Sequence, residues 1–367
     1  MTILLVTTHL NPGGITRYLF NLAKGLKQRG HSVHIASRGG AWETKFRDAG
    51  IGLVAIPLDT KSIFSFPILQ SFWRIRTFLK TTPVDMIHAN TRVSQFLAAL
   101  VSRFGKVPYV CTFHGEFKPR FFRKIFKSSG VLSIAISQHV KQHMRDDLGI
   151  SEWQIRVVLH GVDEKDYQTS DSKEIIRKKY GISGLPVVGI VARLTPEKNH
   201  RILIEAFRLF LETHPQAELV MLGDGRIEGE LKALVAAREI SDKVIFLKHM
   251  NAEEIFPCFD IFVLPSTSEG FGLSAAEALL LGVPAVVAGV GGLVEIVEHE
   301  KTGLILRDIY DSFELCRCLK NLTEDAELRG RLIRNGREHI RKNLSLSQMV
   351  TNTEAVYREA LKIGNKS

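Results

Sequence analysis

Cysteine is scarce in this sequence of 367 residues, and its spacing excludes the usual cysteine-based sites. None of the four cysteines forms the C-x-x-C spacing of a zinc or redox motif, and the close pair Cys316 and Cys318 has no histidine pair beside it. We therefore expect Cys111, Cys258, Cys316 and Cys318 to be free thiols in a reducing compartment.

Long hydrophobic runs are also missing. No apolar run approaches the ~18 residues that a membrane-spanning helix needs. The first run, Ile3–Val6, is too short for the apolar region of a secretory signal and has no basic segment before it. We expect a cytoplasmic protein or one that is attached peripherally to the cytoplasmic face of a membrane.

Acidic residues are depleted from one block of the chain. Residues 61–150 contain 14 Lys and Arg but only 4 Asp and Glu, while the other residues balance at 35 of each, so this block carries the whole net charge of +10. Such asymmetry predicts a negatively charged partner, such as an anionic membrane surface or a phosphorylated acceptor. We expect no nucleic acid, because no helix-turn-helix, zinc or RNA-binding motif accompanies the block.

Short apolar runs do recur, with helix-like segments between many of them. Continuous rather than alternating hydrophobicity is typical of parallel strands buried on both faces, and strand–helix repetition predicts a doubly wound α/β fold. The length favours two domains. The expected strands are Ile3–Thr8, Val33–Ser37, Val84–His88, Tyr109–Phe113, Leu132–Ile136, Val157–Leu159, Val187–Ala192, Glu218–Leu222, Val244–Leu247, Ile261–Leu264 and Ala285–Ala288.

Two segments break this rhythm. Asp163–Lys179 is polar and without a core pattern, so we interpret it as the linker between the domains. Ser345–Ile363 is expected to be a terminal helix, with Met349, Val350, Val356 and Leu361 on its apolar side.

Two loops after expected strands carry groups suited to anions. Gly13-Gly14 would let backbone N–H groups approach an anion at a helix start, although a tight turn explains the glycines equally well. The dinucleotide spacing G-x-G-x-x-G is not present in this loop. Arg193 and Lys198 follow Val187–Ala192, where two cations can neutralise a diphosphate; an ordinary surface loop is the alternative. Thr195 is expected to cap the next helix.

Two carboxylates follow the strand Ile261–Leu264. Glu277 is the only charged residue between Gly270 and Val294, and a carboxylate in so apolar a segment needs strong hydrogen-bond donors. The hydroxyls of a ribose are good candidates, as in dinucleotide sites. The alternative is an exposed edge of the helix. Glu269 lies in the loop before that helix, where a diphosphate could bind at the helix start while Glu269 reaches sugar hydroxyls.

Glu269 and Glu277 are separated by seven residues, which matches the E-x7-E pattern. On this and other motifs the chain resembles the retaining glycosyltransferases of family 4. The resemblance extends in family order over nearly the whole chain. It rests on Gly13-Gly14, Thr112-Phe113-His114-Gly115, Arg193 through Lys198, Gly223-Asp224-Gly225, Leu264-Pro265-Ser266, Gly291-Gly292 with Glu295, and Thr302-Gly303.

The resemblance implies a GT-B fold, in which two Rossmann-like domains face each other across a cleft. Residues 1–165 would form the acceptor-binding domain, joined by the C-terminal helix 345–367 crossing back to it, and residues 172–343 would form the nucleotide-sugar-binding domain. The resemblance implies catalytic roles for His114, Arg193, Lys198 and Glu269. It implies donor-binding roles for Gly14, Gly223, Gly225, His249, Met250, Gly270, Phe271, Gly272, Leu273 and Glu277.

The family retains the configuration of the transferred sugar, and we favour front-face attack assisted by the departing phosphate. The sequence contains no Asp-x-Asp, the metal-binding signature of the other major transferase fold. We expect no cofactor and no metal, with Arg193 and Lys198 in the metal's place. Two positions depart from the family: Arg226 stands where proline is frequent and Lys248 where glycine is frequent, which leaves the nucleobase open.

Two other functions fit the same architecture. A sugar-nucleotide epimerase would release an altered nucleotide sugar, and an inactive nucleotide-sugar-binding protein would not turn over. The intact positions His114, Arg193, Lys198, Glu269 and Glu277 favour the transferase.

Basic and aromatic residues alternate in two stretches of the charged block, Phe117–Lys127 and Lys61–Lys80. Such segments suit a bilayer interface, although the rings could equally pack into the core. We expect a glycan or lipid-linked acceptor, such as a lipopolysaccharide core or glycolipid, approached from the cytoplasmic face.

Overall fold

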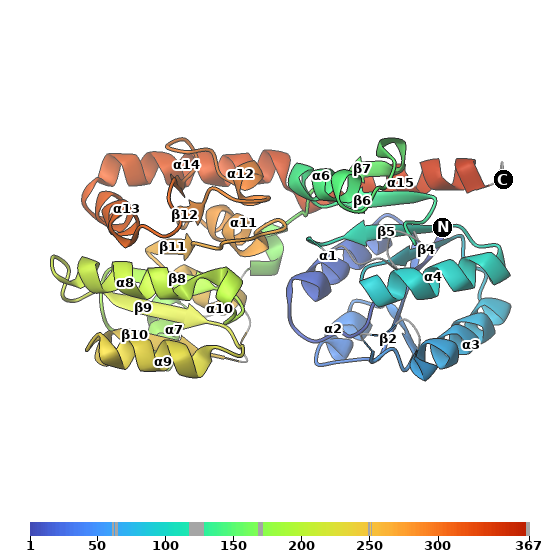
Figure 1. Cartoon of the computed structure of the whole chain (residues 1–367), viewed down its shortest axis with the longest axis horizontal. Coiled ribbons are helices and arrows are strands. Elements are labelled where there is room, and N and C mark those ends of the chain that lie inside the picture. Colours follow the sequence, from blue (N-terminus) through green and yellow to red (C-terminus); the bar gives the residue numbers. More distant parts are fainter. Residues whose placement is uncertain are drawn as a thin grey trace. The chain divides into compact units, whose positions relative to one another are not determined.

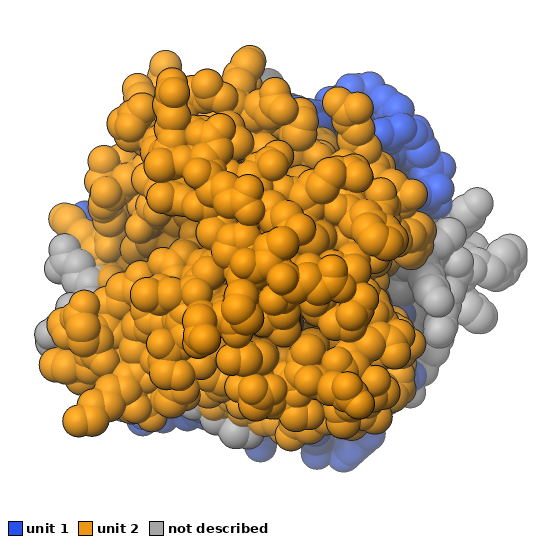
Figure 2. Space-filling view, turned by 90° about the vertical axis from the view of Figure 1, so that its left-hand side faces the viewer, with its two compact units in different colours: residues 1–161, 345–367 blue, residues 162–344 orange. Residues whose placement is uncertain are grey.

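The computed structural model describes residues 1–60, 62, 65–116, 128–167, 172–248, 250 and 252–364. The chain divides into two compact units, which Figure 2 colours separately. Unit 1 comprises Met1–Gly161 and Ser345–Ser367, and unit 2 comprises Val162–Leu344. Residues 162–165, placed in the first domain by the sequence, thus group with unit 2. No described helix is long and apolar enough to cross a membrane.

Unit 1 is built on a seven-stranded parallel sheet with the order β3-β2-β1-β4-β5-β6-β7 (Figure 1). Its strands are β1 (Thr2–Val6), β2 (Ser32–Ser37), β3 (Gly52–Ala55), β4 (Met86–Ala89), β5 (Tyr109–Phe113), β6 (Leu132–Ala135) and β7 (Ile155–Val157). Its helices are α1 (Gly14–Gln28), α2 (Glu43–Asp48), α3 (Phe66–Thr81), α4 (Arg92–Gly105), α6 (Gln138–Asp146) and α15 (Leu346–Gly364).

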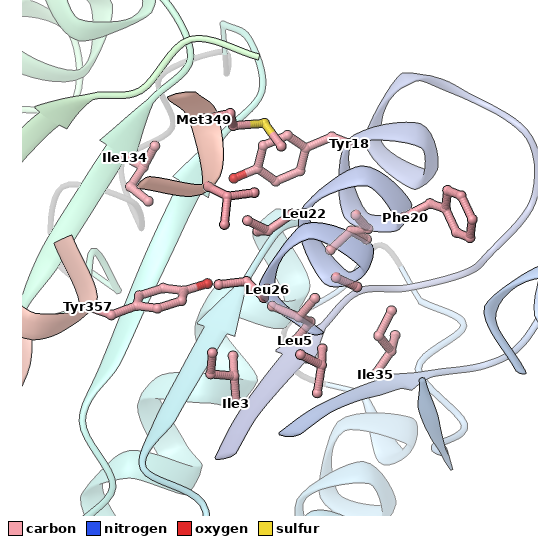
Figure 3. Close-up of a cluster of buried hydrophobic side chains, with 14 of the residues drawn as sticks. Ile3, Leu5, Tyr18, Phe20, Leu22, Leu26, Ile35, Ile134, Met349 and Tyr357 are labelled. Atoms are coloured by element: carbon pink, nitrogen blue, oxygen red, sulfur yellow. The ribbon is translucent and has the colours of Figure 1, made fainter. Parts of the chain in front are cut away.

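Helix α15, at the end of the described residues, completes the core of unit 1, as the family resemblance implied. Helix α15 packs against α1 and β5. Figure 3 shows Met349 and Tyr357 from α15 in one cluster with residues of β1 and α1. Glu354 of α15, itself buried, forms ion pairs with Arg29 (2.8 Å) and His31 (2.5 Å). The C-terminal segment therefore belongs to the fold of unit 1.

Unit 2 has a six-stranded parallel sheet with the order β10-β9-β8-β11-β12-β13. The strands are β8 (Val187–Val191), β9 (Glu218–Leu222), β10 (Val244–Leu247), β11 (Ile261–Leu264), β12 (Ala285–Ala288) and β13 (Leu304–Leu306). The helices are α7 (Lys173–Lys179), α8 (His200–Leu211), α9 (Glu228–Ala237), α10 (Ala252–Ile255), α11 (Leu273–Leu280), α12 (Leu293–Ile296), α13 (Ser312–Glu324) and α14 (Ala326–Asn343). Both units are thus doubly wound Rossmann-like domains, the architecture expected from the sequence.

Candidate functional site

Three neighbouring strands of unit 2 bring the predicted donor residues to one edge of the sheet. Arg193 follows β8, Gly223 follows β9 and Glu269 follows β11, and these strands are adjacent in the order β9-β8-β11. Because the strands are parallel, their carboxyl ends meet at the same edge, which is where open α/β sheets bind ligands. The fold of unit 2 therefore brings the predicted residues Arg193, Gly223 and Glu269 to the same edge of the sheet.

Lys198 and Glu269 form an ion pair at this edge, and both side chains are only about an eighth exposed, at 13% and 15%. Lys198 ends a short 3-10 turn, Pro196–Lys198, which is tied to the loop after β11 by the hydrogen bond from Thr267 N to Glu197 O (2.9 Å). Arg193, in the same loop between β8 and this turn, is exposed. A partly buried ion pair beside an exposed guanidinium gives this edge cations that can approach a diphosphate.

Thr195 precedes the 3-10 turn, but its side chain does not form the cap expected from the sequence. Its hydroxyl oxygen is buried and has no hydrogen-bond partner among the described residues. Pro196 does occupy the first position of the turn.

Glu277 is buried in α11, with 4% of its surface exposed, between alanines that are fully buried. The exposed-edge alternative for this residue is therefore wrong. Tyr167 donates a hydrogen bond of 2.7 Å from its hydroxyl to Glu277 Oε1. The sequence missed Tyr167, because it lies in the polar segment that we interpreted as a linker. Within that segment the structure contains the 3-10 turn Glu164–Tyr167 and helix α7.

Gly223 and Gly225 are required by the packing of neighbouring loops. A β-carbon on Gly223 would lie 1.9 Å from Ala192 O, and one on Gly225 would lie 2.1 Å from Leu194 O. The two loops are also joined by the hydrogen bond from Leu194 N to Asp224 O (2.9 Å). These glycines hold the Arg193 loop against the end of β9, whatever contact they make with a donor.

The segment Gly270–Leu273 forms the start of α11. Gly272 caps the helix in a left-handed conformation (φ 99°), while Phe271 is buried. No described side chain caps this helix start, and its first turn contains no acidic residue. Gly292 N donates to Glu269 O (3.1 Å), which fixes the loop in front of the helix. An uncapped helix N-terminus attracts anions, as the sequence interpretation requires.

The predicted nucleobase loop is only partly described. His249 lies outside the described residues, and Met250 is a half-buried residue in a bend. Lys248, one of the two departures from the family pattern, forms an ion pair with Glu228, which also contacts Lys232 (2.9 Å). Hydrogen bonding to Glu228 raises the pKa of Lys248. Lys248 is therefore a firmly charged group beside the end of β10.

In unit 1, His114 follows β5 and lies against the aromatic ring of Tyr18, with the centroids 4.7 Å apart. Its Nε2 is 3.3 Å from Asn90 Oδ1, at the end of the neighbouring strand β4. Burial holds the pKa of His114 well below its ordinary value, and the nearby His160 and His88 lower it further. His114 is thus a neutral imidazole at pH 7.

A network of buried polar groups lies beneath His114. His88 is paired on both sides, with Nδ1 2.7 Å from the Tyr357 hydroxyl and Nε2 2.6 Å from Thr112 Oγ1. Burial lowers the pKa of His88 to about 3 and raises the pKa of Tyr18 to about 12. The network is therefore uncharged. Its fixed hydrogen bonds support the end of β5, directly before His114.

Gly14 is the first residue of α1 and is exposed. The helix start has no side-chain cap and no acidic residue in its first turn. A β-carbon on Gly13 or Gly14 would meet no atom within 4 Å. This is an open helix N-terminus of the kind that binds anions.

Two further features of the structure delimit the site. Among the described residues, no three His, Cys, Asp or Glu side chains converge as metal ligands. A cavity of unit 2 lined by Pro186, Asp260 and Pro284 lies at the amino ends of β8, β11 and β12. This is the edge opposite to Glu269, so the cavity is separate from the candidate site.

Two family models match consecutive parts of the chain. Residues 12–166 match the model described as Glycosyltransferase Family 4, and residues 172–339 match Glycosyl transferases group 1.

Two curated relatives match over most of their length. The chain is 25% identical to N-acetyl-alpha-D-glucosaminyl L-malate synthase of Bacillus anthracis, covering 97% of each protein. It is 27% identical to an N,N'-diacetylbacillosaminyl-diphospho-undecaprenol alpha-1,3-N-acetylgalactosaminyltransferase of Campylobacter jejuni, covering 89% of this chain and 91% of that protein.

Solved structures share the fold. Anabaena Alr3699/HepE, solved in complex with UDP and glucose, matches with a TM-score of 0.85 at 24% identity, covering 98% of this chain and all of that one. Between them the two family models span both units, so the chain belongs to the GT-B glycosyltransferases, with a family 4 first half and a group 1 second half.

Proposed function

We propose that this glycosyltransferase moves a sugar from a nucleoside diphosphate sugar to a hydroxyl acceptor, with retention of anomeric configuration. The observation that carries the proposal is the Lys198–Glu269 ion pair at the carboxyl edge of the unit 2 sheet, in front of helix α11, which contains the buried Glu277. This edge combines a helix start and cations that can bind phosphates with carboxylates that can accept hydrogen bonds from sugar and ribose hydroxyls.

Each donor group then has a matching protein group. The diphosphate binds at the start of α11, where the helix dipole, Arg193 and Lys198 stabilise the charge that develops on the leaving group. Glu277 accepts hydrogen bonds from the ribose hydroxyls, and Glu269 accepts them from the transferred sugar. Gly14 offers backbone N–H groups to the phosphate, and His114 contacts the sugar near the reacting carbon.

The stereochemical part of the proposal follows from family resemblance. Retaining glycosidases use a nearby carboxylate as a nucleophile. Here Glu269 is held by Lys198, so we favour attack of the acceptor hydroxyl on the same face from which the phosphate departs. The departing phosphate oxygen takes the proton of the acceptor hydroxyl as the new glycosidic bond forms. The cations at Arg193 and Lys198 do the work of a metal ion, and no cofactor is involved.

The reaction itself tests this proposal. Thermal-shift screening against a panel of nucleotide sugars identifies the donor, because ligand at 100 times its dissociation constant stabilises a protein by about 2.7 kcal/mol. Transfer to a glycan or lipid-linked acceptor is then followed by NMR of the product. We expect the donor's anomeric configuration in the product and full activity in a chelator. Three results would contradict the proposal. They are inversion of the anomeric configuration, activity that is lost in a chelator and restored only by magnesium or manganese, and release of an altered free nucleotide sugar, as an epimerase would give.

Glu277→Ala is expected to weaken donor binding by about 1.5–3 kcal/mol, because hydrogen bonds from the ribose to a charged acceptor are lost. The measurement is the dissociation constant of the nucleotide by calorimetry. Tyr167→Phe is the matched control: it removes the hydroxyl that donates to Glu277 but leaves the carboxylate in place. Equal donor affinity in folded Glu277→Ala and wild type would remove Glu277 from the ribose site.

We also propose that unit 1 approaches an anionic membrane carrying the acceptor. The Campylobacter relative is named for a diphospho-undecaprenol acceptor. Of the two basic-aromatic stretches, Phe117–Lys127 lies outside the described residues, and most of the second forms α3.

Helices α3 and α4 support this proposal with an exposed aromatic surface. Phe72 is buried, but its ring contacts Trp73 and Phe104, with the centroids 5.4 and 5.6 Å apart, and both of these rings are exposed. Neither helix contains Asp or Glu. We define the α3–α4 surface by its exposed side chains Phe66, Leu69, Trp73, Arg74, Arg103, Phe104 and Lys106. Rings at the headgroup level and cations facing anionic lipid suit such a surface.

Trp73→Glu is expected to lower binding to anionic liposomes by about tenfold, since it removes a ring from the α3–α4 surface and adds a charge repelled by the lipid. Cosedimentation at low and high salt measures it, and wild-type binding should weaken as salt rises. Trp153→Glu is the matched control: the two tryptophans are 58% and 60% exposed, but Trp153 precedes β7, at the other edge of the unit 1 sheet from β3. No binding at low salt, or equal losses in both variants, would refute the α3–α4 surface.

A further inference from the structure

Asn90 directly follows β4, precedes Thr91, which caps α4, and is 1% exposed. Its backbone N–H donates to Val6 O (3.0 Å), and its side chain lies between two groups. The amide nitrogen Nδ2 is 3.1 Å from His88 O, and the amide oxygen Oδ1 is 3.3 Å from His114 Nε2. The side chain thus joins the two strands β4 and β5 beside the predicted sugar-binding histidine.

These two contacts assign the hydrogen atoms. A backbone carbonyl only accepts hydrogen bonds, so the group facing His88 O must be the amide nitrogen. The amide oxygen then faces His114, and it only accepts as well. Nε2 of His114 must therefore carry the proton, and Nδ1 of a neutral imidazole must carry a lone pair.

The surroundings of His114 favour the neutral ring. Tyr18 from α1 contacts it edge-on, and His160 lies with its ring centroid 5.5 Å away. Burial lowers the pKa of His160 to about 3 and raises that of Tyr18 to about 12, so both are uncharged at pH 7. His88 behind them is uncharged as well. None of these described neighbours is an anion that would stabilise an imidazolium.

We propose that Asn90 is a positioning residue that holds His114 as the Nε2–H tautomer and so presents the Nδ1 lone pair to a hydroxyl of the sugar substrate. Nδ1 is buried and has no hydrogen-bond partner among the described residues, so the side chain holds an unsatisfied acceptor. A lone pair accepts from a hydroxyl and repels a phosphate oxygen, so His114 recognises the sugar and not the diphosphate. The substrate part of this inference rests on the proposed function; the tautomer does not.

NMR of protein labelled with ¹⁵N-histidine tests the tautomer directly. Wild-type His114 is expected to show the ¹⁵N shifts of a protonated Nε2 and an unprotonated Nδ1. These shifts should not change between about pH 6 and 8, the range in which an ordinary histidine titrates. Asn90→Ala should give a mixture of tautomers, because the acceptor that selects one of them is gone. A protonated Nδ1 in wild type, or an unchanged pattern in Asn90→Ala, overturns the proposal.

Kinetics tests the consequence. Asn90→Ala is expected to lower kcat by roughly tenfold while the donor KM stays within about twofold, since one hydrogen bond orients the ring. Asn90→Asp places a carboxylate against Nε2, so it should raise the pKa of His114. Its kcat should then fall as the pH is lowered through a range where wild type is constant, because the protonated ring has no lone pair to offer.

Gln95→Glu is the matched control. Gln95 is also a buried amide, on α4, and donates to Thr112 O (3.4 Å) without touching His114. The same amide-to-carboxylate change there should leave both the tautomer and the pH profile as in wild type. An equal pH shift in Gln95→Glu would show a general electrostatic effect and refute the specific role of Asn90. If the NMR pattern holds but no sugar transfer is found, the proposed function fails and the Asn90 assignment stands.

Discussion

Replacing His114 by alanine is expected to lower turnover by roughly 10- to 150-fold while leaving nucleotide affinity nearly unchanged. A hydrogen bond that involves developing charge is worth about 1.5–3 kcal/mol, which is roughly 10- to 150-fold in rate when the bond forms only in the transition state. Apart from the backbone at Gly14, the groups expected to bind the nucleotide belong to unit 2, whereas His114 belongs to unit 1. Rate and affinity should therefore separate.

The measurement is kcat at saturating donor, beside calorimetric binding of the nucleoside diphosphate. His139→Ala is a suitable control, because it removes a half-exposed imidazole of the same unit that pairs with Glu116 (2.6 Å). Unchanged turnover in folded His114→Ala would exclude this residue from the reaction. Parallel losses of turnover and nucleotide affinity would place its role in donor binding instead.

Lys198→Met should lower kcat/KM by about 10²–10³-fold, the usual effect of removing one preorganised group that stabilises developing negative charge. The substitution keeps the length of the side chain and removes its charge. It also leaves Glu269, which is mostly buried, without its cation, so the sugar-binding carboxylate loses its fixed position. Lys198→Arg should recover part of the rate, because it restores the charge in a different shape.

Lys173→Met tests whether the loss is specific. Lys173 also pairs with an aspartate of unit 2, Asp260 (3.2 Å), but at the amino ends of the strands. We expect wild-type kcat/KM in this variant. If Lys198→Met kept the wild-type rate, the leaving group would have to be stabilised by other residues.

The sequence predicted the two sheets because most of their strands are continuous apolar runs. Two edge strands, β3 and β13, were missed. They have four and three residues, and such short runs resemble the apolar positions of loops and helices. Strand β7 was expected two residues too late, at Val157–Leu159, where the structure has Ile155–Val157. Its pairing with β6 determines its position, and that information is not local.

The strand pattern could bring predicted residues to one edge of a sheet, but it could not give the contacts between them. The carboxyl ends of parallel strands share an edge, so Arg193 and Glu269 could be placed together from the strand pattern alone. The Lys198–Glu269 ion pair joins residues 71 positions apart, and the Tyr167–Glu277 hydrogen bond joins residues 110 apart. The periodicity of apolar residues along the sequence does not predict which distant side chains will pair. Asn90 was missed for the same reason, since its role depends on which atom of the amide faces His114.

The return of α15 to unit 1 has a consequence for synthesis of the chain. Residues 1–161 leave the ribosome first, but the core that includes Tyr18 and Leu22 also needs Met349 and Tyr357, which are made last. At about 5–20 residues per second, the ribosome needs many seconds to add unit 2 before α15 exists. During that interval the nascent first unit exposes the apolar face of α1. A premature stop after Leu344 would therefore leave unit 2 whole and make the earliest-made unit the defective one, a natural substrate for chaperones and proteases.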